Sequence, residues 1–150
     1  MPPIDSGPLG RSTPPTLNEV ERGAIRRFAE ALGDLNPIYF DLEYARASGF
    51  KGVVAPPTFP LTFNAGVDHR ALLGVGQRSL VLADFTVEYQ RPLVAGDRVL
   101  VKTRVVEAGA RPGPAGKVEV GVVEDEGLDE AGALVYRARR TFVVRGLREG

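Results

Sequence analysis

The sequence predicts an α+β fold, with helices in the first half of the chain and an antiparallel sheet in the second. Apolar residues recur at every fourth position from Val20 to Leu32, which is the period of an amphipathic helix. From Ser79 onward the period changes to two, which is the period of β-strands. Three turn-forming segments then divide the second half into four strands: "PLVAGD", "ARPGPAG" and "DEGLDEAG".

Composition limits the possible functions. The 150 residues carry 19 basic and 19 acidic side chains, so no net charge draws the chain to nucleic acid or to a membrane. Without cysteine and with one histidine, a metal site built by the protein is not expected. The start of the chain has no apolar run, and 18 consecutive apolar residues occur nowhere, so we expect a cytoplasmic protein.

The chain is expected to form one domain with an extended N-terminal arm. Residues 1–16 hold five of the 12 prolines, and we expect them to be ordered only where they lie on other parts of the protein. Residues 17–150 are then a single domain. Its first helix spans Val20 to Leu32 and ends at Gly33. Asp41 caps a second, short helix that runs to about Ala47 and is closed by Gly49.

The segment from Val53 to Pro57 must be extended, because each residue before a proline is pushed out of the helical region. Thr58 can then cap a helix over 58–67, with Pro60 in its first turn. That helix would be apolar nearly all round, which predicts a place inside the protein against the sheet. We expect the four strands to follow one another as an antiparallel meander. The residues expected on their inner faces are Val81, Ala83, Phe85, Val87, Tyr89; Val99, Val101, Thr103, Val105; Val118, Val120, Val122; and Leu134, Tyr136, Ala138, Phe142, Val144.

Three segments together resemble the MaoC-like hydratases and dehydratases of the hot-dog superfamily: "FAEALGDLNPIYFD", "VVAPPTFP" and "EYQRPLVAGDRV". The likeness runs from about Thr13 to Val144 and is closest to the N-terminal-type dehydratase domains, including the HadA-type subunits of (3R)-hydroxyacyl-carrier-protein dehydratases. It implies an antiparallel sheet of about five strands wrapped around a long central helix and paired with a second hot-dog domain. It also implies an acyl thioester substrate, carried on CoA or on acyl carrier protein, and no cofactor or metal.

The resemblance assigns a catalytic loop to "GDLNPIYFD". Asp34 stands at the position of the family's catalytic aspartate, and Asn36 and Pro37 match the motif, but Tyr39 replaces the catalytic histidine. With a reference pKa of about 10, a tyrosine used as base at pH 7 would cost about 4 kcal/mol before chemistry begins. Alternatively, Asp34 and Asn36 are turn residues and Tyr39 is a packed aromatic.

A second departure lies ahead of the expected central helix. Catalytic relatives carry His-Gly there, and the glycine N–H helps to bind the thioester carbonyl, whereas this chain has Pro56 and Pro57. Proline has no N–H, so that donor is absent. The "APPTF" form matches the HadA-type side of the family, which shapes the acyl tunnel. The residues assigned to substrate binding on this basis are Pro57, Thr58, Phe59 and Phe63, although both phenylalanines are equally expected in the core.

Other polar residues have simpler interpretations. His69 is expected on the surface or in a loop, outside the family's motif. Arg137, Arg139 and Arg145 form a row that is expected to be solvated, although it could meet CoA phosphates or an acidic carrier protein. The acidic segment "EDEGLDE" is expected to be a solvated hairpin loop.

Three hypotheses remain open. In the first, the chain is one subunit of an enoyl-thioester hydratase or (3R)-hydroxyacyl-thioester dehydratase whose partner supplies the histidine. In the second, it is a self-sufficient homodimeric hydro-lyase that uses Asp34 with a water or with Tyr39. In the third, it is a non-catalytic protein that binds acyl thioesters or serves as a scaffold.

Overall fold

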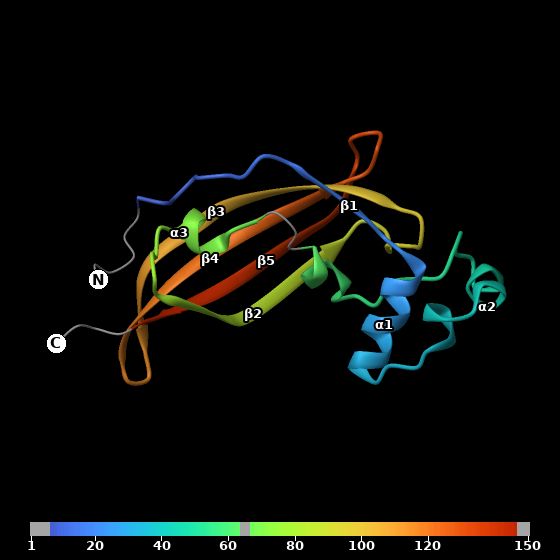
Figure 1. The fold of residues 1–150 in the computed structure, drawn as a ribbon, viewed down its shortest axis with the longest axis horizontal. Helices are drawn as coiled ribbons and strands as arrows, with labels where there is room; N and C mark the ends of the chain where they lie inside the picture. The colour runs from blue at the N-terminus through green and yellow to red at the C-terminus, as the bar shows by residue number, and fades with distance from the viewer. Residues whose placement is uncertain (1–6, 64–66, 147–150) are drawn as a thin grey trace.

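The computed structural model describes residues 7–63 and 67–146 (Figure 1). Within them, a curled antiparallel sheet of five long and short strands carries a few short helices. The elements in chain order are β1 (Thr16–Glu19), α1 (Arg22–Leu32), the 3-10 helix η1 (Pro37–Tyr39), α2 (Leu42–Ala47), the 3-10 helix η2 (Phe59–Thr62), α3 (His69–Leu73), β2 (Ser79–Tyr89), β3 (Arg98–Gly113), β4 (Gly116–Leu128) and β5 (Leu134–Arg145). The α1 and α2 helices lie together near one end of the sheet, while α3 lies over its other half (Figure 1).

The strand order in the sheet is β1-β3-β4-β5-β2, so the expected meander is correct for β3, β4 and β5 but wrong for β2. That strand pairs with β5 at the opposite edge from β1. The reason lies in the segment between β2 and β3, which does not close a hairpin. Its Leu93 carbonyl accepts the N–H of Ala55, and Val94 bridges to Val54, so the segment is held against residues 53–55 instead.

The expected inner faces are confirmed on β3, where Val99, Val101 and Val105 are buried together with Thr103. On β2 only the second half follows the prediction. A bulge between Leu82 and Asp84 shifts the alternation, so Val81 is exposed although it was expected inside. The bulge could not be read from the alternating sequence, because each half of the strand keeps its own period of two.

The two hairpin loops are shorter than the sequence suggested, because β3 and β4 continue into the segments expected to turn. Asp125, expected in a solvated loop, therefore lies within β4 and is buried. Its carboxylate is compensated by the hydroxyl of Thr103 and the guanidinium of Arg140, which is why a charge can be buried there.

The helices flanking residues 33–41 follow the sequence closely. Gly33 ends α1 in the left-handed conformation, with φ of 71°. The carboxylate of Asp41 accepts the N–H of Tyr44 at 3.1 Å and caps α2. The N-terminal arm lies along β3: the N–H of Gly10 donates to the carbonyl of Val105, so residues 7–15 continue the edge that β1 begins.

The helix expected over 58–67 is wrong across the part of it that the structure describes. Residues 59–62 form the single 3-10 turn η2, Thr58 makes no side-chain cap, and Phe63 has left the helical region with ψ of 60°. Residues 64–66 lie outside the described part of the chain. Phe59 and Phe63 are both buried, as a helix would also place them, so the apolar pattern alone does not distinguish a helix from this turn.

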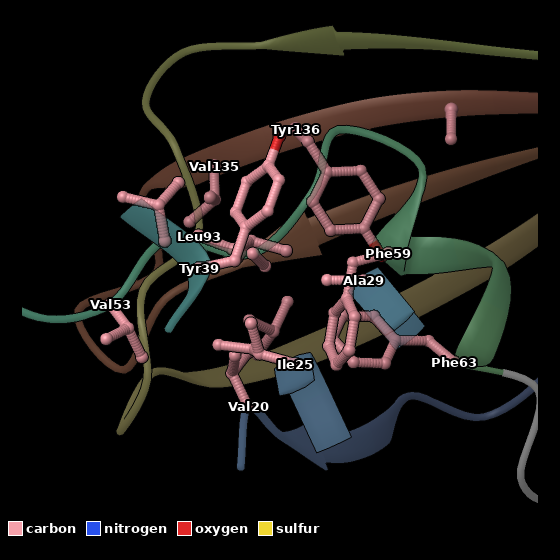
Figure 2. Packing of buried hydrophobic residues seen from close by; sticks show 14 of the residues in the cluster. Val20, Ile25, Ala29, Tyr39, Val53, Phe59, Phe63, Leu93, Val135 and Tyr136 are labelled. Carbon is pink, nitrogen blue, oxygen red and sulfur yellow. The ribbon is translucent and has the colours of Figure 1, made fainter. Parts of the chain in front are cut away.

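The core consists of two clusters on the face of the sheet that η2 and α3 cover. In the larger one, the ring of Phe59 makes edge-to-face contacts with Phe28 at 5.6 Å and with Phe63 at 5.5 Å. Figure 2 shows the rings of Phe59 and Phe63 together with Tyr136, whose ring centre is 6.4 Å from that of Phe63. This cluster joins α1, η2 and the sheet, and so fixes the segments that carry the candidate site.

Candidate functional site

The loop between α1 and η1 is built by short-range hydrogen bonds of its own polar residues. The carboxylate of Asp34 accepts the N–H of Asn36 at 3.3 Å, and the side-chain oxygen of Asn36 accepts the N–H of Ile38 at 3.2 Å. Pro37 begins η1 at a position where its missing N–H costs nothing. These turns project Asp34 and Asn36 into solvent and direct Tyr39 inward.

Asp34 and Tyr39 are brought together, as the motif predicts. The Tyr39 hydroxyl donates a hydrogen bond to the carboxylate of Asp34. Burial of the tyrosine, and then the negative charge of Asp34, raise the pKa of Tyr39 above its usual value of 10.0. The phenol therefore keeps its proton at neutral pH and faces Asp34 as a hydrogen-bond donor.

Tyr39 also lines an open, mainly apolar cavity of about 380 Å³ between the loop, residues 54–57 and the end of β2. One wall is formed by Pro57 and Tyr89, and the Tyr89 hydroxyl donates to the Pro57 carbonyl at 2.6 Å. Burial raises the pKa of Tyr89, so this bond persists well above neutral pH. The lining residues are Ile38, Tyr39, Phe50, Val54, Ala55, Pro57, Tyr89, Gln90, Arg91, Pro92 and Leu93.

The residues assigned from sequence fall into three groups. Tyr39 and Pro57 line the cavity, and Asp34 is linked to it through Tyr39. Thr58 is half-buried beside the wall without being part of the lining. Phe59 and Phe63 are not in the lining either: they are core residues with 1% and 6% of their surface exposed.

Sequence reasoning did not single out most of the remaining lining. Phe50 was not considered, Val54 and Ala55 appeared only within the extended segment from Val53 to Pro57, and Gln90 and Arg91 appeared only as letters of a motif. The available signal was that each of the three quoted segments contributes residues to this cavity. Arg91 at its rim is held by the carboxylate of Asp97 at 2.8 Å.

Other candidate features lie away from this cavity. His69 begins α3 and is half-buried, with its ring 5.1 Å from that of Phe142, so it is less exposed than expected. Burial, and then the charge of Arg140, lower the pKa of His69. Among the described residues no cluster of potential ligands could hold a metal ion, and no helix is long and apolar enough to span a bilayer.

The curled sheet and the cavity beside its covering segments define a hot-dog domain of the MaoC-like hydratase and dehydratase kind, as the sequence predicted. Among solved structures, a MaoC-like dehydratase superposes with a TM-score of 0.80 at 25% identity, covering 93% of this chain and 43% of that one. A chain of the C-terminally truncated HadBC (3R)-hydroxyacyl-ACP dehydratase complex of Mycobacterium tuberculosis superposes with a TM-score of 0.77 at 24% identity. The superposition covers 90% of this chain and 96% of that one.

Sequence comparison places the chain more narrowly. The profile of the FAS1-like dehydratase domain region matches residues 9–138, and the chain belongs to that family. A UPF0336 protein of Streptomyces avermitilis is 41% identical over 98% of this chain and 99% of its own length. A second UPF0336 protein, from Streptomyces coelicolor, is 39% identical over 97% of this chain and 98% of its own length.

Proposed function

We propose that this chain is the acyl-binding subunit of an enoyl-thioester hydratase or (3R)-hydroxyacyl-thioester dehydratase, and that a partner subunit supplies the catalytic base. In hydration, the oxygen of water adds to C3 of the enoyl thioester, and C2 receives a proton. The water must lose a proton to a base as it attacks, which requires a group with a pKa near the working pH.

The observation that carries the proposal is the state of Tyr39. It occupies the position of the motif's histidine, donates to Asp34 and has a raised pKa. At pH 7 fewer than about one molecule in a thousand would be ionised, a cost of more than about 4 kcal/mol. General base catalysis contributes about 10²–10⁴-fold, so this cost would cancel most of the gain.

The cavity wall supports the same division of labour. Where a glycine N–H would bind the thioester carbonyl, Pro57 offers only a carbonyl oxygen, and Tyr89 already donates to it. Loss of one such donor typically costs about 3 kcal/mol in the transition state. The apolar cavity itself remains, which suits binding of an acyl chain more than activation of its carbonyl.

A partner is consistent with the relatives' assemblies. The HadBC and ChsH1–ChsH2 structures from Mycobacterium tuberculosis, which share this fold, are both named as complexes of two different subunits. We propose that this chain pairs in the same manner with a MaoC-like subunit whose loop reads Gly-Asp-x-Asn-Pro-x-His.

The test is hydration of crotonyl-CoA, followed by loss of the enoyl absorbance. The full chain alone should show no turnover, and activity should appear when a subunit with the histidine-bearing motif is added. As a control, the same partner with its motif histidine replaced by alanine should remain inactive. High activity of this chain alone would refute the division of labour, whereas binding without turnover in every mixture would favour a scaffold.

The Asp34→Asn variant separates the subunit hypothesis from a self-sufficient enzyme. Asparagine keeps the side-chain oxygen that accepts the N–H of Asn36, so the loop is preserved while the charge is lost. If the partner performs the acid–base steps, the complex should lose less than about tenfold in kcat. If Asp34 acts on the water itself, activity should fall by about 10² or more.

A further inference from the structure

A buried polar network crosses three neighbouring strands beneath η2. The hydroxyl of Thr103 on β3 donates to one carboxylate oxygen of Asp125 on β4 at 2.6 Å. The Nε of Arg140 on β5 donates to the other oxygen at 3.3 Å. The side chains of Asp125 and Arg140 are only 5% and 4% exposed, so the ion pair is almost completely removed from water.

Stability alone does not explain such a network. Desolvation of two charges offsets most of their attraction, and apolar residues of similar volume often replace a buried ion pair at no cost. Such pairs can instead fix one arrangement among several that pack equally well. The question is therefore which arrangement of the fold depends on Asp125 and Arg140.

The network extends from the sheet to the backbone of the covering segment. The Nη2 of Arg140 donates to the carbonyl of Pro60 at 3.0 Å, and its guanidinium lies 5.7 Å from the ring centre of Phe85. The same Pro60 carbonyl accepts the N–H of Phe63, the bond that closes η2. Arg140 thus contacts the turn at the point where its own hydrogen bonding ends.

The other end of this segment is held in an analogous way. Tyr89, on the strand adjacent to β5, donates to the carbonyl of Pro57, which forms the cavity wall. A single 3-10 turn has too few internal hydrogen bonds to hold its own position. Two side chains of the sheet therefore fix the carbonyls at residues 57 and 60, one before η2 and one inside it.

We propose that Thr103, Asp125 and Arg140 form a positioning device that holds η2 over the sheet and thereby sets the wall of the cavity. Asp125 orients the guanidinium, Thr103 orients Asp125, and the guanidinium orients Pro60. None of the three lines the cavity, so they act through the backbone of the turn. The effect on an acyl ligand rests on the proposed function, but the effect on the turn does not.

The experiment replaces the network as a unit, with Thr103→Val, Asp125→Leu and Arg140→Met in one full-length protein. Because both charges are removed together, the midpoint of thermal unfolding should remain within a few degrees of wild type. Native-state hydrogen exchange at the amides of Phe59 and Phe63 should nevertheless become about tenfold faster or more. Exchange of core amides in β4 should be unchanged.

A matched control removes an ion pair from the same strands on the exposed face. Arg139 Nε and Glu124 Oε2 lie 3.1 Å apart, on the opposite face of the sheet from Arg140 and Asp125, so Glu124→Gln with Arg139→Met should leave exchange in the turn unaltered. If the triple variant does not fold, the same exchange measurement is made on Arg140→Lys. A single ammonium lacks the fork geometry that joins Asp125 and Pro60, so exchange in the turn should again become faster. Turn amides that exchange as in wild type in the folded variant would overturn the proposal.

Binding provides the second measurement. Titration with crotonyl-CoA should show at least a fivefold weaker affinity for the triple variant than for the control, with global stability equal. If crotonyl-CoA binds neither the wild-type protein nor the two variants, the proposed function fails. Hydrogen exchange still decides whether the network positions the turn.

Discussion

Replacing Tyr39 by phenylalanine separates a catalytic role of its hydroxyl from a positioning role. The substitution removes one oxygen and keeps the ring, which is only 6% exposed and belongs to the core. What is lost is the hydrogen bond to Asp34, whose carboxylate is exposed and can be solvated by water instead. A hydrogen bond to a charged group is worth about 1.5 kcal/mol at the low end, appropriate to this exposed acceptor.

We expect Tyr39→Phe to lower both the hydration rate and the stability only modestly. The hydration rate of crotonyl-CoA by the chain with the proposed histidine-bearing partner should fall by less than about tenfold, and the free energy of unfolding should fall by about 1.5 kcal/mol. If Tyr39 were the general base, the rate should fall by about 10²–10⁴ at unchanged KM. The wild-type rate would also rise with pH up to the raised pKa of Tyr39, and this rise would disappear in Tyr39→Phe.

The assay is therefore kcat and KM from pH 6 to about pH 10, together with urea unfolding at pH 7. Tyr44→Phe provides the matched control, since it removes the same oxygen from an exposed tyrosine on α2 that does not line the cavity. A loss of more than about 10² in kcat for Tyr39→Phe, with the control at wild-type activity, would refute the reasoning.

Three further predictions concern the buried tyrosines. Within the described residues the buried Tyr136 hydroxyl has no hydrogen-bond partner, so Tyr136→Phe should raise the free energy of unfolding by about 1 kcal/mol in urea titrations. The Tyr89 hydroxyl donates to Pro57, so Tyr89→Phe should lower the same free energy by about 1 kcal/mol. The pKa values of Tyr39, Tyr89 and Tyr136 are raised in the folded state, so the unfolded chain releases protons that the folded chain keeps. These tyrosines should leave stability unchanged between about pH 7 and pH 9, and above about pH 10 stability should fall by up to about 4 kcal/mol per pH unit. A flat profile above about pH 10 would contradict this. A Cβ at Gly127 would overlap the ring of Tyr136, so Gly127→Ala should cost about 2 kcal/mol or more, measured in the same titrations.

Local signals in the sequence predicted the elements around the candidate site correctly. Gly33 and Asp41 act through the backbone of their own turns, so their effect does not depend on the rest of the fold. The inner face of β3 was also predicted correctly, because the burial of Val99, Val101 and Val105 follows from the alternation of apolar and polar residues alone. Recognition of the three segments as a family pattern then gave the hot-dog fold.

Features set by tertiary contacts could not be derived in this way. The place of β2 beside β5 depends on Val94 pairing with Val54, which lies 40 positions earlier in the chain. Burial of Asp125 depends on two partners from other strands, so an acidic stretch was interpreted as a loop. The covering segment was expected to be a helix because its apolar composition signals burial but does not distinguish a helix from a tight turn.

The geometry of the loop also gives Asp34 a structural role that does not depend on which residue stands at position 39. The turn at residues 34–38 is closed by the side chains of Asp34 and Asn36 and by the proline between them and Tyr39. No hydrogen bond of this backbone uses the side chain at position 39, so histidine and tyrosine fit the same scaffold. Asp34 therefore has a structural reason to be present that is independent of chemistry, and its presence alone does not make the site catalytic. The group that faces Asp34 is a phenol that holds its proton at neutral pH, and under the proposed function this makes the loop part of a binding site whose base comes from the partner.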